Sequence, residues 1–210
     1  MTRSHGLSRP SLLLAGVLAL FPLQDYALRV DSAVTPFYPD GSYEANVAVV
    51  AIEMDRAGKR LDTELVYGEP PFAGAALEAL THWKFSPSPS ADRSRTSITF
   101  VFRPRSMERV PLNARITGQQ KARPNRPPLP LEMFDTGYPQ TCDTEGAVVL
   151  ELSVNESGEV DALAPILGFP SLTGAVEMEV KSWKFLPATV EGKPVRGRAV
   201  VVISFVHPAL

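Results

Sequence analysis

Residues that could carry out chemistry are few in this 210-residue sequence, and none falls at a catalytic spacing. The histidines, His5, His82 and His207, are too scattered for a metal cluster. One cysteine, Cys142, excludes an intramolecular disulfide and multi-cysteine zinc or iron–sulfur sites. Phosphate-loop, zinc-protease, serine-hydrolase and dinucleotide-binding motifs are absent. The sequence therefore predicts a protein that is not an enzyme and uses neither a cofactor nor a metal.

The strongest chemical signal comes from the backbone of the last expected strand. Residues 199–206 (AVVVISFV) carry no charge and are apolar on both faces. At an open edge, such a strand would present unpaired N–H and C=O groups to other chains. We therefore expect it to have a partner, which is another copy, another chain or a ligand peptide. The alternative is that its outer valines pack beneath the linker.

An internal repeat appears at a shift of 100 residues. Twelve of the fifty positions from 38 to 87 are identical 100 residues later, without a gap. The match includes both tryptophans, Trp83 and Trp183. After Pro187 the second copy has three extra residues, so Phe102 aligns with Phe205. We infer that the chain arose by duplication.

Each copy is expected to fold as a strand–strand–helix–strand unit of the α+β class. In the second copy, apolar residues alternate from 147 to 154, which predicts a half-buried strand. Gly158 lies in the following turn, and Pro165 in the second strand indicates an edge or a bulge. A helix follows from 172, and the final strand closes the copy.

The first copy has the same pattern, with strands near 48–54 and 60–67, a helix over 72–83 and a last strand over 98–102. Each tryptophan continues the apolar stripe of its helix and is expected to cover the sheet. The residues expected in the core are Trp83, Phe85, Trp183 and Phe185.

The copies are expected to be separate domains joined by a proline-rich tether. Residues 103–126 carry seven basic residues and one acid, which predicts a stiff, solvated linker or contact with an anionic envelope surface. The net charge of the whole chain, −2, argues against nucleic-acid binding. The expected segments are 1–30 for targeting, 31–106 for the first copy, 107–131 for the linker and 132–210 for the second copy.

An uncharged apolar run, residues 12–23, follows Arg3 and Arg9. As a helix it would measure about 18 Å, short of the roughly 30 Å hydrocarbon core of a membrane. This length favours a secretory signal peptide over a short inner-membrane anchor. We expect export to the periplasm through this N-terminal signal.

The motifs of the second copy resemble those of the TonB C-terminal domain, found in energy transducers of the bacterial envelope. The first copy matches more weakly, because it lacks the Gly-x-Pro-Val segment. The residues that carry the resemblance are Tyr138-Pro139, Gly146-Ala147-Val148, Gly158, Trp183-Lys184-Phe185-Leu186-Pro187, Gly192-Lys193-Pro194-Val195 and Phe205.

The resemblance implies a periplasmic module that binds an extended peptide as an added β-strand. The partners it implies are N-terminal peptides of outer-membrane transporters or other envelope proteins, in transport across the outer membrane. The family's long proline-rich spacer is missing here, which argues against full energy transduction. The residues expected to bind the peptide are Tyr138, Pro139, Val200, Val201, Val202, Ile203 and Ser204.

A rival hypothesis gives the last strands a different partner. The two copies could pair these strands with each other and form an internal pseudo-dimer, which would be a structural scaffold of the envelope. Self-association of two chains through the last strand is a further expectation. In a third hypothesis, the first copy is a degenerate spacer and only the second copy binds.

Overall fold

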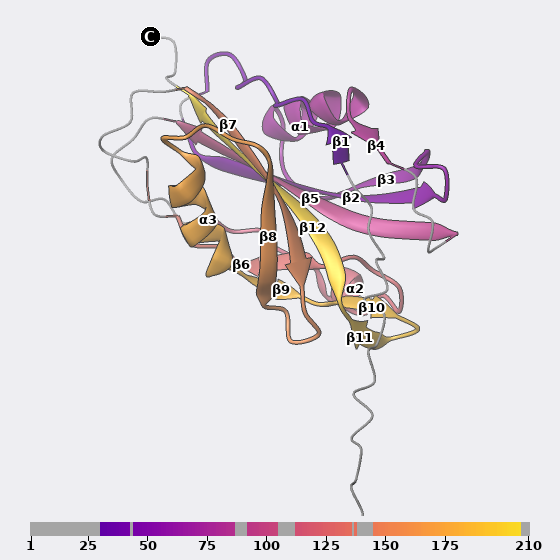
Figure 1. Cartoon of the computed structure of the whole chain (residues 1–210). Helices are drawn as coiled ribbons and strands as arrows, with labels where there is room; N and C mark the ends of the chain where they lie inside the picture. The colour runs from indigo at the N-terminus through magenta and orange to yellow at the C-terminus, as the bar shows by residue number, and fades with distance from the viewer. Residues whose placement is uncertain are drawn as a thin grey trace, which may run out of the picture.

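The structure, a computed structural model, describes residues 30–42, 44–86, 92–104, 112–135, 137 and 145–206. These residues form a mixed α+β fold that consists mostly of sheet, with three short helices (Figure 1). The first half contains β1 (Val30–Ser32), β2 (Asn46–Asp55), β3 (Arg60–Tyr67), α1 (Phe72–Thr81), β4 (Lys84–Phe85) and β5 (Arg93–Pro104). The second half contains α2 (Gly118–Lys121), β6 (Leu129–Glu132), β7 (Gly146–Val154), β8 (Val160–Leu167), α3 (Thr173–Lys181), β9 (Lys184–Leu186), β10 (Ala188–Val190), β11 (Lys193–Val195) and β12 (Gly197–Val206).

The two copies share contacts as well as sequence. The indole N–H of Trp83 donates to the carbonyl of Val34 at 2.8 Å, and that of Trp183 donates to the carbonyl of Phe134 at 3.0 Å. A short strand opens each copy and pairs just after the helix, β1 with β4 and β6 with β9. The sequence did not predict these short strands, because two to four residues carry no readable periodicity.

The repeats are joined by their last strands in one six-stranded sheet of order β3-β2-β5-β12-β7-β8. β5 and β12 run parallel, in register from Ser97 opposite Ala199 to Pro104 opposite Val206. All other neighbours in this sheet are antiparallel. The expected pairing of the two last strands is therefore present, and the copies do not stand apart on a tether.

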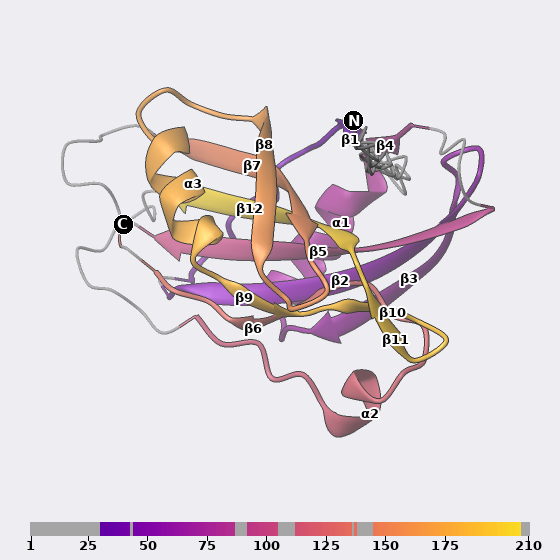
Figure 2. The same ribbon diagram turned by 60° about the horizontal axis from the view of Figure 1, so that its bottom comes forward.

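Parallel pairing of equivalent strands places the two helices on opposite faces of the sheet. It relates the copies by an approximate two-fold axis along the strands, and this rotation turns the sheet over. Figures 1 and 2 show α1 on one side of the sheet and α3 on the other. We call these sides the α1 face and the α3 face.

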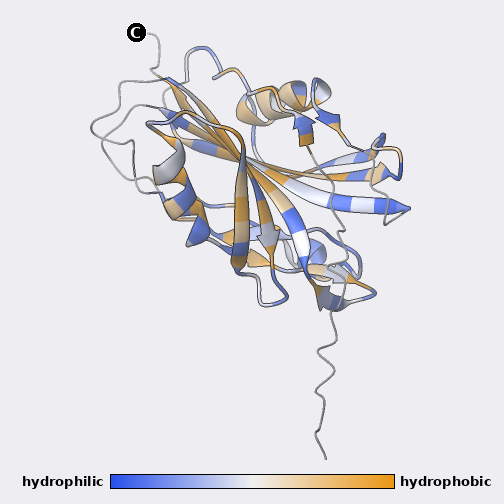
Figure 3. Ribbon diagram, in the orientation of Figure 1, coloured by the Kyte–Doolittle hydropathy of each residue, from blue (hydrophilic) through white to orange (hydrophobic). Residues whose placement is uncertain are grey.

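Each face has its own apolar core. On the α1 face, β2 lies beneath α1 and Trp83, and on the α3 face, β7 lies beneath α3 and Trp183. The central strands serve both cores: Val202 of β12 lies in the first and Val201 in the second, which accounts for a strand that is apolar on both sides. In Figure 3 the middle of the sheet is mostly orange, the colour of hydrophobic residues, and the start of β5 is bluer, the colour of hydrophilic ones. Of the four predicted core residues, Trp83, Trp183 and Phe185 are buried, and Phe85 is half-buried against the α1 core.

The described part of the linker packs on the sheet as part of the fold. Leu112, Ile116 and Leu129 belong to the α3 core and cover the face of the first copy that α1 leaves open. The hairpin β10–β11, where the second copy is longer, holds this segment in place. Arg126 and Thr189 exchange backbone hydrogen bonds of 3.2 and 3.0 Å. From residue 112 onward the segment is therefore not a free extended tether.

A glycine in each hairpin turn is required by close backbone contact. Gly58 and Gly158 both have φ of +81°. A Cβ at Gly58 would lie 2.6 Å from the carbonyl oxygen of Phe85, and one at Gly158 would overlap the carbonyl oxygen of Phe185. The repeated glycine thus lets the turn pack on the strand that follows the helix.

We expect Gly158→Ala to lower the free energy of unfolding by about 1–3 kcal/mol, because alanine meets both a positive φ and the Phe185 carbonyl. Gly174→Ala is the matched control, since a Cβ on this helical glycine meets nothing within 4 Å. Alanine also favours a helix over glycine, so the control should be unchanged or more stable. Urea denaturation measures both, and equal stabilities would contradict this role of the turn.

A buried ion pair links the two copies at the ends of the central strands. Arg103 of β5 lies with its Nε 3.2 Å from the Oδ1 of Asp135, just after β6, and the side chains are 2% and 3% exposed. A charge buried this deeply is costly unless it is compensated. The pair therefore favours the arrangement in which the first copy's last strand meets the second copy.

We expect Asp135→Asn to lower the free energy of unfolding by about 3–5 kcal/mol, because it removes a negative charge that lies directly beside the buried Arg103 cation. Asparagine keeps an oxygen that can accept the Gly137 N–H, which is 2.9 Å from Asp135 Oδ1. Any loss of stability is therefore due to the lost charge. Glu159→Gln is the control, because it breaks an exposed pair with Lys184 and should have little effect. Equal effects in guanidinium denaturation would contradict this assignment.

Candidate functional site

The residues expected to bind a peptide do not lie at an open edge. Tyr138 and Pro139 lie outside the described residues. The remaining five, Val200 to Ser204, lie within β12, where Val202 is opposite Phe100 of β5 on one side and Val149 of β7 on the other. A peptide strand cannot be added to β12 in this sheet unless β5 first leaves. The edge expected to receive a peptide is thus occupied by the last strand of the other copy.

The two ends of the large sheet, β3 and β8, are the candidate sites for strand addition. In β8, Leu163 lies opposite Leu152 and Pro165 opposite Leu150. Proline has no N–H to donate to β7, so this register turns the backbone of Pro165 and Leu163 outward. Pro165 was the sequence signal for an edge, although it did not show which strands would form the two ends.

The same register holds in β3. Thr63 lies opposite Ile52 and Leu65 opposite Val50, as their counterparts do 100 residues later. The backbone of Thr63 and Leu65 therefore faces outward, and Leu65 has the N–H that Pro165 lacks. Each edge is a row of backbone groups of the kind that accepts an added strand.

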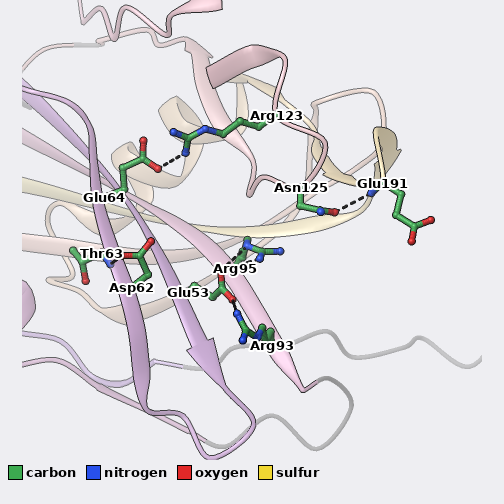
Figure 4. A network of polar contacts seen from close by, with 9 residues as sticks. All are labelled: Glu53, Asp62, Thr63, Glu64, Arg93, Arg95, Arg123, Asn125 and Glu191. Carbon is green, nitrogen blue, oxygen red and sulfur yellow. Dashed lines mark hydrogen bonds and ion pairs between the residues drawn. The ribbon is translucent and has the colours of Figure 1, made fainter. Parts of the chain in front are cut away.

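Linker side chains limit the β3 edge at one end. The side-chain amide of Gln120 in α2 donates to the carbonyl of Val66 at 2.8 Å, and Arg123 pairs with Glu64. Figure 4 shows the Arg123–Glu64 pair beside a second group, in which Glu53 of β2 binds Arg93 and Arg95 of β5. The contacts lie on the α3 face, so the α1 side of β3 is left uncovered by this part of the linker.

Charge stabilises the Glu53 cluster. Burial disfavours the ionised carboxylate, but hydrogen bonds and positive charge from Arg93 and Arg95 outweigh it and hold the pKa of Glu53 below its ordinary value. Both ion pairs measure 2.8 Å. The cluster thus ties β2 to the start of β5 and leaves no carboxylate there suited to general-acid chemistry at neutral pH.

A shallow groove of about 390 Å³ lies between β8 and α3. On the α3 side of the groove, Met178 is 74% exposed, and a Cβ at Gly174 would meet nothing within 4 Å. The lining residues are Val160, Asp161, Ala162, Leu163, Gly174, Glu177, Met178 and Lys181. Its lining mixes apolar side chains, among them Leu163 and Met178, with the charges of Asp161, Glu177 and Lys181.

Tyr38, the first-copy counterpart of Tyr138, acts as an anchor for the chain entering β2. Its ring packs edge-on against Phe72 at 5.6 Å and Phe102 at 6.1 Å between centroids, and its hydroxyl donates to the carbonyl of Glu44. Burial, reinforced by the negative charge of Glu44, raises the pKa of Tyr38 to about 12. In this copy the tyrosine packs in the fold and does not line an open peptide site.

Within the described ranges, no three histidine, cysteine, aspartate or glutamate side chains come together as a metal site. No helix there is both long and apolar enough to cross a membrane. The apolar segment 12–23, Cys142 and His207 lie outside the described residues. His82 follows the last turn of α1, and its backbone N–H donates to the carbonyl of Ala79 at 3.1 Å.

We expect alkaline titration to show a phenol that ionises near pH 12 and is absent from Tyr38→Phe. Because an unfolded tyrosine ionises near pH 10, the unfolded chain loses this proton first, and the contribution of Tyr38 to stability falls as pH rises from about 10 to 12. Absorbance at 295 nm measures the ionisation. Tyr67→Phe is the control and should keep the late phase; loss of that phase only in the control would contradict the assignment.

Comparison with known proteins gives this chain no family. No protein-family model matches it, and no curated protein matches it. Its function must therefore be inferred from its own geometry.

Proposed function

We propose that this chain is a non-enzymatic protein of the bacterial cell envelope that binds extended protein segments by strand addition. In this proposal, the chain consists of two repeats resembling the TonB C-terminal domain, exported by the N-terminal signal. The observation that carries the proposal is the parallel pairing of β5 with β12. This pairing uses the last strands for assembly and leaves outer strands for partners.

The pairing supports a rigid binding protein. In the TonB-like interpretation, the last strand of each copy is the edge that would receive a peptide. In this sheet, the edge of each last strand is occupied by the last strand of the other copy. The pairing runs from Ser97 opposite Ala199 to Pro104 opposite Val206. Peptide binding therefore moves to β3 or β8, where the backbone faces outward at the same repeat positions.

A second candidate function is a structural scaffold without a peptide ligand. Two observations favour it. The buried Arg103–Asp135 pair fixes the first copy against the second, and the hydrogen bonds between Thr189 and Arg126 hold the linker on the second copy. A stiff two-repeat unit of this kind could set the spacing between envelope partners. The two functions differ in whether an outer edge exchanges with free peptide.

We expect the full-length chain, labelled with ¹⁵N, to show saturable amide shifts in β3 or β8 when it is titrated with peptides from the N-terminal plugs of outer-membrane transporters. Added backbone hydrogen bonds would change the environment of those amides. Val200 to Ser204 should remain protected from hydrogen exchange, because both sides of β12 are paired.

Two other outcomes separate the hypotheses. Shifts confined to β12, with loss of protection in β5, would show that peptide displaces the other copy, and would overturn the outer-edge proposal. No shift in a folded, protected chain would overturn peptide binding and leave the scaffold function.

A further inference from the structure

We propose that β3 is the receiving edge and that its occupant is an extended peptide with apolar side chains at alternate positions and polar ones between them. This inference rests on the proposed function and identifies the edge and the chemistry of the partner. It comes from a comparison of the two copies at equivalent positions of their outer strands.

The outer strand of the second copy carries the features that protect an edge from pairing. Pro165 removes an outward N–H, and Asp161 places a charge, paired with Arg196, beside the outward backbone. Proline and charge are the usual means by which proteins block edge-to-edge pairing. At the equivalent positions β3 has Leu65 and Leu61, so it lacks these two features, and its own charges lie at the alternate positions Asp62 and Glu64.

Apolar side chains accompany the open backbone of β3. Leu61 is 47% exposed and Leu65 is 40% exposed. Leu65 lies opposite Val50, so its side chain is on the α1 face, where Leu77 of α1 is half-buried against the core. Side chains of an added strand that point to this face would meet a leucine surface. Burial of these leucines would favour apolar residues at those positions of the peptide.

The α3 face of β3 determines which residues suit the alternate positions of the peptide, between its apolar ones. Asp62 and Glu64 lie opposite Glu53 and Ala51, hence on the α3 face, and Arg123 pairs with Glu64. Alternate residues of an added strand would lie beside these charges, which favours polar or basic side chains. The edge therefore selects a two-residue period of apolar and polar residues.

The usable edge is short. At one end, the register of β3 with β2 shifts between Glu53 and Met54, and at the other, the side-chain amide of Gln120 donates to the carbonyl of Val66. The open stretch is 61–65. Such a length suits a segment of a larger protein better than it suits a long fibre-forming strand.

A second copy of this chain is a poorer occupant. An antiparallel β3–β3 pair centred on Thr63 would place Asp62 of each chain opposite Glu64 of the other. Like charges directly opposite each other destabilise a strand pair. Pairing of β3 with the β8 of another chain would meet Pro165, which cannot donate.

The test introduces into β3 the proline that β8 has at the equivalent position. We expect Leu65→Pro to weaken binding of a fluorescent synthetic peptide, about nine residues long and alternating valine with lysine or threonine, by about tenfold or more, because one backbone bond is lost and the edge is distorted. The full-length chain should accept this proline, since Pro165 occupies the equivalent position. Leu163→Pro is the matched control, because it removes an outward N–H from the other edge and should leave affinity within about twofold.

Leu61→Asp, which copies Asp161, provides a second route if Leu65→Pro lowers the melting temperature. It should also weaken binding, without any backbone change. A peptide with its central valine replaced by proline should not bind to the wild-type chain. Fluorescence anisotropy measures all four cases, and circular dichroism checks that each variant is folded.

Each contrary outcome has a distinct meaning. Loss of binding in Leu163→Pro alone would overturn the choice of β3 while peptide binding itself stands. Absence of binding to the folded wild-type chain would overturn the proposed function. A dimer of the peptide-free chain that dissociates in Leu61→Asp would show that the occupant is a second copy, and would overturn the peptide proposal.

Discussion

The parallel pairing of β5 with β12 is the constraint on which the rest of the structure depends. It requires a two-fold axis along the strands, and such an axis places α1 and α3 on opposite faces. Each central strand must then be covered on both sides, because one face belongs to each core. β12 is apolar on both sides, whereas β5 buries the polar residues Ser97 and Thr99 toward the α3 core. This requirement accounts for 199–206, whose valines would be a hazard at an exposed edge but are ordinary residues at the centre of a sheet.

An opposite-face arrangement creates a second problem, because each helix covers only its own half of the sheet. In the first copy, the uncovered half is closed by Leu112, Ile116 and Leu129, which precede the second copy. The hairpin β10–β11 then holds the same segment through Thr189, so an addition unique to one copy stabilises the contact with the other. The two copies thus share one sheet, and the ion pair of Arg103 with Asp135 adds a cost to separating them.

Local features of the fold could be predicted from sequence, and long-range ones could not. The turn at Gly158, the helix stripes and the burial of both tryptophans come from patterns within a few residues, and the repeat comes from comparison of the sequence with itself. The partner of β12 could not be predicted in this way. Apolar residues on both faces of a strand show only that both faces are covered, and the pairing with β5 joins residues about 100 positions apart in the sequence. Proline content predicted a tether from 107 to 131, yet the part from residue 112 onward packs on the sheet through apolar residues such as Ile116. The outer edges were missed for the same reason. Pro165 indicates an edge or a bulge, and it lies in an outer strand next to a register shift, but only the strand order shows which strands form the two ends.

Asymmetry between the two outer strands has a physical reason in the symmetry of the duplication. A sheet with two open and complementary ends can add further chains head to tail, and such contacts do not close, so they produce filaments. Blocking one end is sufficient to prevent growth, because a chain with a single open edge can join at most one other chain in this way. Pro165 and Asp161 block the second copy, which allows Leu61 and Leu65 to stay exposed on the first. The open edge can thus be kept for a short foreign segment without making the protein a template for its own aggregation.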